Sequence, residues 1–400
     1  MFGRPRSFRD IVVHPTQELP RPSADAYRGG PDWPHFARQV LVRHCWGAIP
    51  RPVDRRPHPA APEWPYFDPE RYLNPRHRDT LRWRPADTDV DGADSGLWCG
   101  PITEHFGHMI ADFAMRLVLS AGLDRETPLV FGLPPLPEAR PPGFFWHMLD
   151  HFGIDRERIM LVRRPTRFAR LSVVPQAERP YGGFADRAYL RLLDRLAAAA
   201  APVEREAPWV FVSRARLRRG RFAGEAALDR AMATAGVRVF HPETVALPEQ
   251  LRLYRAARRL IFSEGSALQA LQLLGHVDAD IVILPRRPGR LGRNIAALRP
   301  LRARAKSLRP LPVMRGIVCG LYDSGRPQTP RGMTILDEAR LIAGLARLGI
   351  DLAPHWDPRA YADERDADLA QWVEERLAAP AHPGERAFIK ARLAALSLRV

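Results

Sequence analysis

The stretch LIFSEGSALQALQLLG, residues 260–275, decides how the chain folds. A short apolar run ends at Ser263, a tight Glu-Gly-Ser turn follows, and apolar residues then recur at helical spacing. A strand that leads through a short turn into a helix is the repeating unit of a parallel sheet. Gly265 lets the backbone approach a ligand closely, and Ser266 is a good helix cap. Glu264 is unexpected here, because the bare amides at the start of such a helix attract anions.

The same alternation extends to both sides of this stretch. In the second half, strands are predicted at 208–214, 237–242, 260–263 and 280–285, and helices at 224–236, 247–259 and 266–275. In the first half, strands are predicted at 96–100, 128–134, 158–164 and 167–175, and helices at 103–122, 141–153 and 186–201. Strands alternating with helices of this length indicate a parallel sheet covered on both faces.

Two such blocks predict an α/β protein with two Rossmann-like domains that face a cleft. The expected divisions are an irregular, proline-rich N-terminal extension (1–90), two Rossmann-like domains (91–204 and 205–310) and a helical C-terminal segment (311–400). The extension contains one strand candidate, at 39–46. Ligands of open α/β sheets bind at the carboxyl ends of the strands, so we expect the site there.

The composition excludes several classes of protein. The formal charge is +16, but lysine supplies only Lys306 and Lys390 of the 61 basic residues, and arginine is spread along the whole chain. Single-strand binders interleave basic and aromatic residues, a pattern absent here, so nucleic acid is not the expected partner. A basic face also suits peripheral contact with anionic lipid. The three cysteines are too widely spaced for a disulfide framework or a zinc motif. No apolar run of membrane-spanning length and no signal-peptide core is present, so we expect a cytoplasmic protein.

The usual nucleotide motifs are also missing. No G-x-G-x-x-G follows a strand, and neither lysine follows a glycine, which excludes a P-loop. Instead, the strand at 208–214 ends in Ser213-Arg214, and Arg216, Arg218 and Arg219 follow before the next helix. A guanidinium at the carboxyl end of a strand can hold a phosphate through two parallel hydrogen bonds. The alternative is a solvated basic loop. Arg214 and the turn at 264–267 end strands of one predicted sheet, so both could face one diphosphate.

Four stretches, taken in order, resemble glycosyltransferase family 61. They are EHFGHMIADFAMRL (104–117), FVSRARLRRGRFAGE (211–225), FHPETVALPEQLRLYRAA (240–257) and FSEGSALQALQLL (262–274). The resemblance covers roughly residues 97–290 and implies a GT-B-like, two-domain enzyme that transfers a sugar from a nucleotide sugar with inversion. The chain departs from the family pattern at Ser263-Glu264-Gly265, where Pro-His-Gly is usual, and at Gly224, where Asn is usual.

The resemblance and the residues together give the expected site. The donor-binding residues are Arg214, Arg219, Glu225, Glu243, Glu264, Gly265, Ser266 and Ala267. Glu225 and Glu243 are expected to pair with arginines or contact ribose. Glu264 would repel a diphosphate unless it points aside, pairs with an arginine or contacts a sugar hydroxyl. Binding through arginines and helix amides needs no metal and no cofactor beyond the nucleotide-sugar substrate.

The acceptor side is expected on the helix at 103–122. His105, His108 and Asp112 are spaced i, i+3 and i+7, which puts them on one face, with Arg116 one turn further. Asp112 or His105 could take the proton from the acceptor hydroxyl, with His108 and Arg116 nearby. The structural alternatives are an Asp112–Arg116 pair and a buried His105 that donates to the backbone.

Metal binding is the less favoured interpretation of this helix. His105, His108 and Asp112 could converge on a metal, but no distant ligand completes the set. The triplet Asp278-Ala-Asp280 precedes its predicted strand and so lies at the wrong end of the sheet for a metal-bound diphosphate. The expected protein is therefore a metal-independent glycosyltransferase with a glycan or polysaccharide acceptor. A scaffold that has kept the fold and lost the site, and a basic nucleic-acid binder, are the two rival hypotheses.

Overall fold

The computed structural model describes residues 6–14, 49–52, 91–133, 139–163, 166–173, 178, 187–198, 209–288 and 299–398 of the 400-residue chain. The strand predicted at 39–46 lies outside this part of the chain. The described residues form mixed α/β structure with parallel strands, as predicted. The chain divides into two compact units. Unit 1 comprises Met1–Ala200, Gln272–Gly275 and Ala296–Ala303, and unit 2 comprises Ala201–Leu271, His276–Ile295 and Arg304–Val400.

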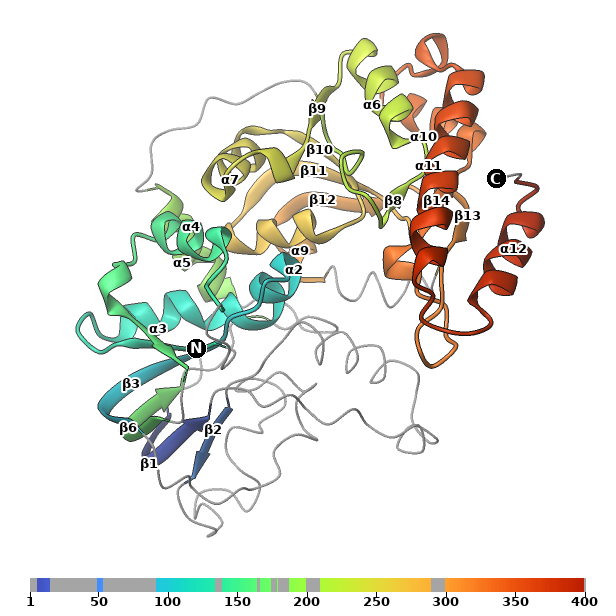
Figure 1. Cartoon of the computed structure of the whole chain (residues 1–400). Coiled ribbons are helices and arrows are strands. Elements are labelled where there is room, and N and C mark those ends of the chain that lie inside the picture. The colour runs from blue at the N-terminus through green and yellow to red at the C-terminus, as the bar shows by residue number, and fades with distance from the viewer. Residues whose placement is uncertain are drawn as a thin grey trace. The chain divides into compact units, whose positions relative to one another are not determined.

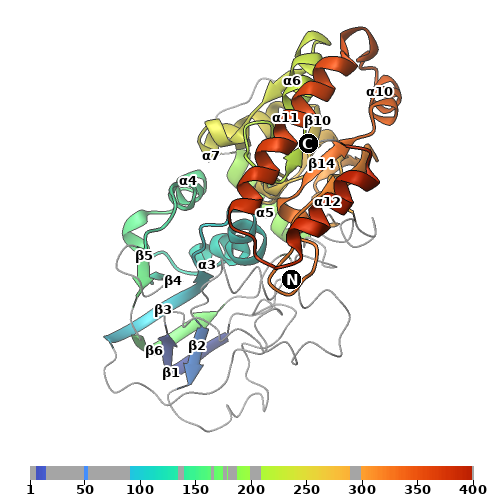
Figure 2. The same cartoon turned by 45° about the vertical axis from the view of Figure 1, so that its right-hand side comes forward.

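Unit 1 is built on a six-stranded sheet in the order β2-β1-β6-β3-β4-β5 (Figure 2). Its strands are β1 (Arg6–His14), β2 (Ile49–Pro52), β3 (Asp91–Pro101), β4 (Leu129–Gly132), β5 (Ile159–Val162) and β6 (Thr166–Val173). The last four run parallel to one another, and β1 pairs antiparallel with both β2 and β6. The N-terminal 90 residues are therefore not irregular throughout, because two of their segments are strands of this sheet.

The core of unit 1 lies between this sheet and its helices. The helices include α4 (Gly143–His151), α5 (Arg187–Ala198), the 3-10 turn η6 (Arg156–Arg158) and the short α9 (Arg299–Arg302). Trp98, Phe131, Phe145 and Phe168 are completely or almost completely buried. Phe131 and Phe145 meet edge to face at 5.0 Å between ring centroids, which joins β4 to α4.

The helix predicted at 103–122 is present but irregular. It consists of α2 (Phe106–His108), the π-helix η4 (Met109–Phe113), the 3-10 turn η5 (Ala114–Arg116) and α3 (Leu117–Leu123). The wide turn is visible in the bond from the amide of Ala114 to the carbonyl of Met109, an i→i+5 step. By length and composition alone Phe106–Leu123 could cross a membrane, contrary to expectation, but 62% of it is buried inside the fold. A buried core helix meets the same criteria.

Unit 2 is built on a five-stranded parallel sheet in the order β12-β11-β10-β7-β9. The strands are β7 (Val210–Val212), β9 (Arg238–Phe240), β10 (Arg259–Ser263), β11 (Val277–Leu284) and β12 (Ala305–Pro310). The connections include α6 (Glu225–Thr234), η7 (Pro242–Thr244), α7 (Leu247–Ala256) and η8 (Ser266–Leu273). The chain adds β9 on one side of β7 and then crosses to the other side to add β10. The strand order therefore reverses at β7.

The prediction of a helical C-terminal segment is wrong in part, because the segment also contains strands. Residues beyond 311 contribute β13 (Met314–Val318) and β14 (Met333–Leu336), which form a small sheet with β8 (Arg221–Phe222) in the order β13-β14-β8. Several helical elements accompany it: η9 (Thr329–Arg331), α10 (Glu338–Ala346), η10 (Ala353–His355), α11 (Pro358–Ala378) and α12 (Glu385–Ala395). Figure 1 shows α11 beside β14 and β8. Buried residues of β14, α11 and α12 form a shared apolar cluster, so this segment is an integral part of unit 2.

Candidate functional site

Four neighbouring strands of unit 2 end at the same edge of their sheet with polar residues. Arg214 follows β7, Glu243 follows β9, Glu264 follows β10, and Arg286 and Arg287 follow β11. In parallel α/β sheets, ligands bind outside the carboxyl ends of the strands where the strand order reverses. That point lies between β7 and β10, so Arg214 and the turn after β10 occupy the expected ligand position.

Arg214 is held by the backbone around it. Its Nε donates to the carbonyl of Gly220 at 2.8 Å, and its guanidinium lies against Gly265. A Cβ added to Gly265 would lie 2.0 Å from Nη1 of Arg214. Neither Nη1 nor Nη2 of Arg214 makes a hydrogen bond with a described residue. Burial lowers the pKa of this guanidinium, and the nearby carboxylate of Glu225 opposes that effect. The structure thus brings together the arginine and the turn that the sequence analysis paired.

Glu225 closes the loop that carries Arg214. It is fully buried at the start of α6 and accepts hydrogen bonds from the amides of Arg214 and Phe222, each at 2.9 Å. The two bonds tie both ends of the loop to one carboxylate. The side chain is fully enclosed, and its two bonds to backbone amides hold the loop in place.

Glu264 pairs with the two arginines that follow β11. Its carboxylate accepts from the amide of Arg286 at 2.9 Å and from Nε of Arg287 at 2.8 Å, and it forms an ion pair with Nη2 of Arg287. Arg286 also donates through Nε to the backbone carbonyl of Glu264 at 2.7 Å. Burial alone would raise the pKa of Glu264, but the two arginines outweigh it and the pKa lies below its ordinary value. Of the arrangements expected for Glu264, the structure contains the pairing with an arginine.

Three arginines lie close together at this edge. Arg214, Arg286 and Arg287 interact with one another, and the pKa of Arg286 falls well below its ordinary value through burial and the two neighbouring guanidinium groups. Glu264 and Glu225, which are both buried, face these three cations, and the carboxylate of Glu243 also acts on Arg214. Partly desolvated guanidinium groups attract anions, and they bind phosphate in particular.

The turn after β10 differs from its prediction in helix type. The segment Ser266–Leu273 is a 3-10 helix rather than an α-helix. Its first turn bond runs from the amide of Leu268 to the carbonyl of Gly265, so the amides of Ser266 and Ala267 come before it and have no acceptor in the helix. The hydroxyl of Ser266 makes no hydrogen bond with a described residue, so the predicted cap is not formed.

The other arginines of the loop point to different partners. Arg218 forms an exposed ion pair with Glu375, and Arg221 forms a partly buried one with Asp368. Arg219, expected in the donor site, is exposed and makes no hydrogen bond with a described residue. Arg216 is exposed and lowers the pKa of Asp229. Only Arg214 of this loop therefore lies against the turn after β10.

A second titratable group lies beside β9. Oδ2 of Asp229 is 3.3 Å from Nε2 of His241, and Nδ1 of His241 is 3.8 Å from Oε1 of Glu243. Burial is the main cause that raises the pKa of Asp229 to about 7, and Glu225 and Glu243 add to it. Burial also lowers the pKa of His241. The sequence analysis proposed Glu243 here but not its two partners.

The residues proposed for the acceptor side lie in unit 1. Nδ1 of His105 accepts from the amide of His108 at 3.3 Å, and the two rings are 4.4 Å apart between centroids. His105 is exposed, so it is not the buried donor considered as an alternative. The predicted common face of His105, His108 and Asp112 assumes α-helical spacing. The π-helix η4 has more residues in each turn, so positions i, i+3 and i+7 do not fall on one face there. The side chain of Asp112 lies outside the described part of the structure.

Arg116 is a core residue rather than part of an open acceptor surface. Its side chain is 2% exposed, and its charge reaches the buried thiol of Cys99. Burial raises the pKa of Cys99 to about 12, and Arg116 and Arg158 reduce that rise. This position removes Arg116 from the candidate site.

In the described residues, no three His, Cys, Asp or Glu side chains gather as metal ligands do. Asp278 and Asp280 lie inside β11, not before it as predicted, and Asp280 accepts from the hydroxyl of Ser307 at 2.6 Å. They are near the amino end of the strand, opposite the edge that carries Arg214.

Comparison with known proteins assigns the chain to a class. The family model Glycosyltransferase 61 matches residues 106–274. The chain carries a glycosyltransferase 61 domain. It is therefore a glycosyltransferase, and a sugar donor and a glycan acceptor follow in general terms. No curated protein matches the chain.

The glycosyltransferase 61 domain includes Arg214, Glu225 and the turn after β10, but it ends before Arg286 and Arg287. Sequence reasoning missed these two arginines. Their signal is the segment Pro285-Arg286-Arg287-Pro288, which follows a predicted strand at the same edge of the sheet as Arg214.

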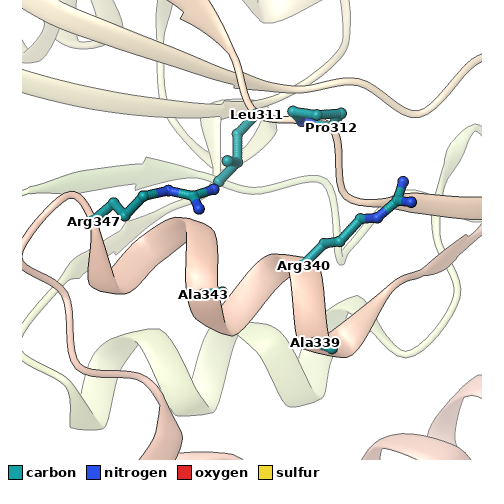
Figure 3. A pocket seen from close by; sticks show the side chains of 6 residues that line it. All are labelled: Leu311, Pro312, Ala339, Arg340, Ala343 and Arg347. Atoms are coloured by element: carbon teal, nitrogen blue, oxygen red, sulfur yellow. The ribbon is translucent and has the colours of Figure 1, made fainter.

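A shallow pocket elsewhere on the glycosyltransferase contains none of these residues. It has a volume of about 420 Å³ and lies between α10 and the chain leading to β13, with Arg340 and Arg347 at its sides (Figure 3). Leu311, Pro312, Ala339 and Ala343 complete its lining. Arg340 is engaged with Asp337 at 3.2 Å. The pocket is separate from the candidate site.

Proposed function

We propose that the protein transfers a sugar from a nucleotide-sugar donor to a hydroxyl of a glycan or related acceptor, with inversion and without a metal ion. The observation that carries the proposal is the juxtaposition of Arg214, Arg286 and Arg287 with the turn at Gly265, where the strand order reverses. Arg214 offers two terminal nitrogens that no described residue binds. They suit two oxygens of a diphosphate.

In this proposal the diphosphate is the leaving group. The bond from the anomeric carbon to the phosphate oxygen breaks while the acceptor oxygen attacks from the opposite face, and a base takes the hydroxyl proton. The departing diphosphate gains negative charge, which preorganised guanidinium and amide donors stabilise without a metal. Asp112 or His105 remains the proposed base, with His108 nearby. Glu243 is proposed to contact the nucleoside, and Arg219 to assist Arg214.

The pairing of Glu264 supports a working site over a lost one. A free carboxylate beside the amides of Ser266 and Ala267 would oppose anion binding. Glu264 is instead engaged by Arg286 and Arg287, so its charge is already compensated. This supports the transferase over a scaffold that has kept only the fold.

The wider setting is proposed from the family and the composition. We propose a GT-B-like arrangement in which the first Rossmann-like domain supplies the acceptor side and the second binds the donor. We further propose a bacterial, cytoplasmic enzyme of polysaccharide biosynthesis that contacts the inner membrane peripherally, since a net charge of +16 suits anionic lipid.

A thermal-shift screen of the full chain with low-millimolar nucleoside diphosphates tests the proposal. A ligand present at 100 times its dissociation constant stabilises the folded state by about 2.7 kcal/mol. We expect UDP or GDP to raise the Tm, the rise to persist in EDTA, and Arg214→Ala to remove it. Arg218→Ala, which removes a neighbouring exposed arginine, serves as the control and should keep the shift. No shift with any nucleotide would favour the scaffold, and steeply salt-dependent binding of an oligonucleotide would favour the nucleic-acid binder.

A further inference from the structure

Helix α11 lies outside the glycosyltransferase 61 domain, yet it contacts the loop that carries Arg214. Asp368 of α11 binds Arg221 through two hydrogen bonds, Nη1 to Oδ2 and Nη2 to Oδ1, both 2.6 Å. Oδ2 of Asp368 also accepts from the amide of Gly224 at 2.7 Å. One carboxylate of the C-terminal segment thus binds two points near the end of the loop.

These contacts lie directly next to the residue that fixes Arg214. Gly224 precedes Glu225, whose carboxylate holds the amides of Arg214 and Phe222 at 2.9 Å each. Gly224 has φ of +70°, and a Cβ there would lie 2.8 Å from the ring of Tyr361 on α11. Helix α11 therefore packs on the backbone at the point where the loop becomes α6.

The loop needs such a counter-charge because of its sequence. Five arginines stand between positions 214 and 221, and like charges at this spacing repel one another. The Arg221–Asp368 pair is well shielded, with side chains 10% and 21% exposed. The Arg218–Glu375 pair from the same loop to the same helix is 75% and 38% exposed, so solvent screens it. Of the two carboxylates that α11 presents to the loop, Asp368 is therefore the better placed to hold it against its own repulsion.

We propose that Asp368 is a positioning residue for the donor site: through Arg221, Gly224 and Glu225 it holds the loop so that the guanidinium of Arg214 faces the diphosphate. Asp368 contacts no substrate, and its effect passes through Arg214. The inference rests on the proposed function, and it adds the C-terminal segment to the donor-binding machinery.

The test compares Asp368→Asn with Glu375→Gln in the full chain. Each variant removes one carboxylate that α11 presents to the loop. Of these two carboxylates, only that of Asp368 accepts a hydrogen bond from the backbone of Gly224. We expect Asp368→Asn to raise the Kd of the nucleoside diphosphate that stabilises the wild type, UDP or GDP, at least tenfold. Glu375→Gln should change it less than twofold. Equal affinities in the wild type and Asp368→Asn would overturn the inference and leave the proposed function standing.

A double-variant cycle separates positioning from general damage. If Asp368 acts through Arg214, adding Asp368→Asn to Arg214→Ala lowers affinity no further than Arg214→Ala alone. An additional tenfold loss in the double variant would show that Asp368 acts on the fold at large, against the inference. Should Asp368→Asn fold poorly, Arg221→Lys keeps the charge and loses the paired geometry, and the same non-additivity is expected.

Trypsin provides a readout that needs no nucleotide. A released loop should be cleaved after Arg218 and Arg219 several times faster in Asp368→Asn than in the wild type or in Glu375→Gln. If the wild type binds no nucleoside diphosphate, the proposed function fails whatever trypsin shows. If the wild type binds and cleavage is unchanged in Asp368→Asn, the positioning inference fails alone.

Discussion

The guanidinium of Arg214 lies against the bare backbone of Gly265. The glycine is required by this contact rather than by its own conformation, because a Cβ at residue 265 would lie 2.0 Å from Nη1 and 2.7 Å from Cζ of Arg214. Two turns that are 51 residues apart in sequence therefore meet at one point, and any side chain larger than hydrogen at position 265 must displace the arginine.

Gly265→Ala is accordingly expected to lower the affinity for a nucleoside diphosphate while the protein stays folded. Hydrogen bonds to charged groups contribute about 1.5–3 kcal/mol, so a displaced guanidinium should weaken binding roughly 10- to 100-fold. Isothermal titration with the nucleotide that stabilises the wild type measures the change. Gly122→Ala is the matched control, because nothing lies within 4 Å of a Cβ added there. Unchanged affinity in Gly265→Ala would contradict the proposed place of Arg214.

Glu264→Gln should change stability and anion affinity in opposite directions. The substitution leaves Arg286 and Arg287 without their buried counter-charge, and breaking such a pair costs about 3–5 kcal/mol. It also removes a negative charge next to the proposed diphosphate, so binding should tighten, more at low salt than at high salt. Chemical denaturation and nucleotide titration at two salt concentrations check both effects. Glu375→Gln, in an exposed pair, should cost less than about 1 kcal/mol. A variant that is both stable and unchanged in affinity would mean that Glu264 is not coupled to the site.

Asp229 should make stability fall as the pH rises from about 4 to about 7. Its pKa is raised to about 7 in the folded protein, chiefly by burial, and in an unfolded chain it is close to 3.9. Below the unfolded value the carboxyl is protonated in both states and its contribution is fully present. As the pH rises, the unfolded state loses the proton first, so the contribution is lost by the time the folded group ionises.

Asp229→Asn isolates this effect. Two other groups act in the opposite direction: His241, whose pKa is lowered mainly by burial, and Glu264, whose contribution is lost only in acid. The difference between wild type and variant, measured by denaturation from pH 5 to pH 8, removes the effect of Glu264. We expect Asp229→Asn to be more stable than the wild type at pH 8 by a few kcal/mol, with the advantage shrinking toward pH 5. A flat curve for Asp229→Asn would show that this carboxyl is not buried as described.

Glu385→Ala should strongly destabilise the C-terminal segment. Glu385 is fully buried and accepts from Nε of Arg376 at 2.6 Å and from the amides of Leu321 and Ala381 at 2.6 Å and 2.8 Å. Its loss removes the counter-charge of Arg376, which keeps only the carbonyl of Leu321 as acceptor, and leaves two amides without their carboxylate partner, at a cost of about 3–5 kcal/mol. The free energy of unfolding in urea measures this cost. Glu374→Ala, at an exposed position of α11, is expected to change it by less than about 0.5 kcal/mol.

Local pattern predicted most of the sheet in unit 2. The strands β7, β9, β10 and β11 lie where apolar runs alternate with segments of helical spacing. This alternation alone predicts that Arg214 and Gly265 lie at one edge of the sheet. The partner of Glu264 was out of reach of the same reasoning. Arg287 is 23 residues further along the chain. Whether its side chain reaches the carboxylate of Glu264 depends on tertiary packing, which the periodic spacing of apolar residues does not predict.

Two further misses have physical causes. The π-helix η4 contains Met109 and Ile110, which are both fully buried, and the spacing of apolar residues does not distinguish a π-helical turn from an α-helical one. The strand β8 is two residues long and pairs with β14 more than 100 positions later, so neither strand has a local pattern that marks it as part of a sheet. The alternative of a solvated basic loop stayed open because the counter-charges of the loop, Asp368 and Glu375, also lie far away in sequence.

The order of strands in unit 2 also limits how the chain can be divided. A polypeptide cut after Leu274, at the end of the family match, would lose β11 and β12. Strand β10, which is an interior strand in the whole chain, would then be an exposed edge strand. Its exposed amides and carbonyls would invite pairing between molecules, and Glu264 would lose both of its cations. A fragment chosen by homology alone would therefore tend to aggregate and would lack Arg286 and Arg287, two of the three arginines at this edge of the sheet.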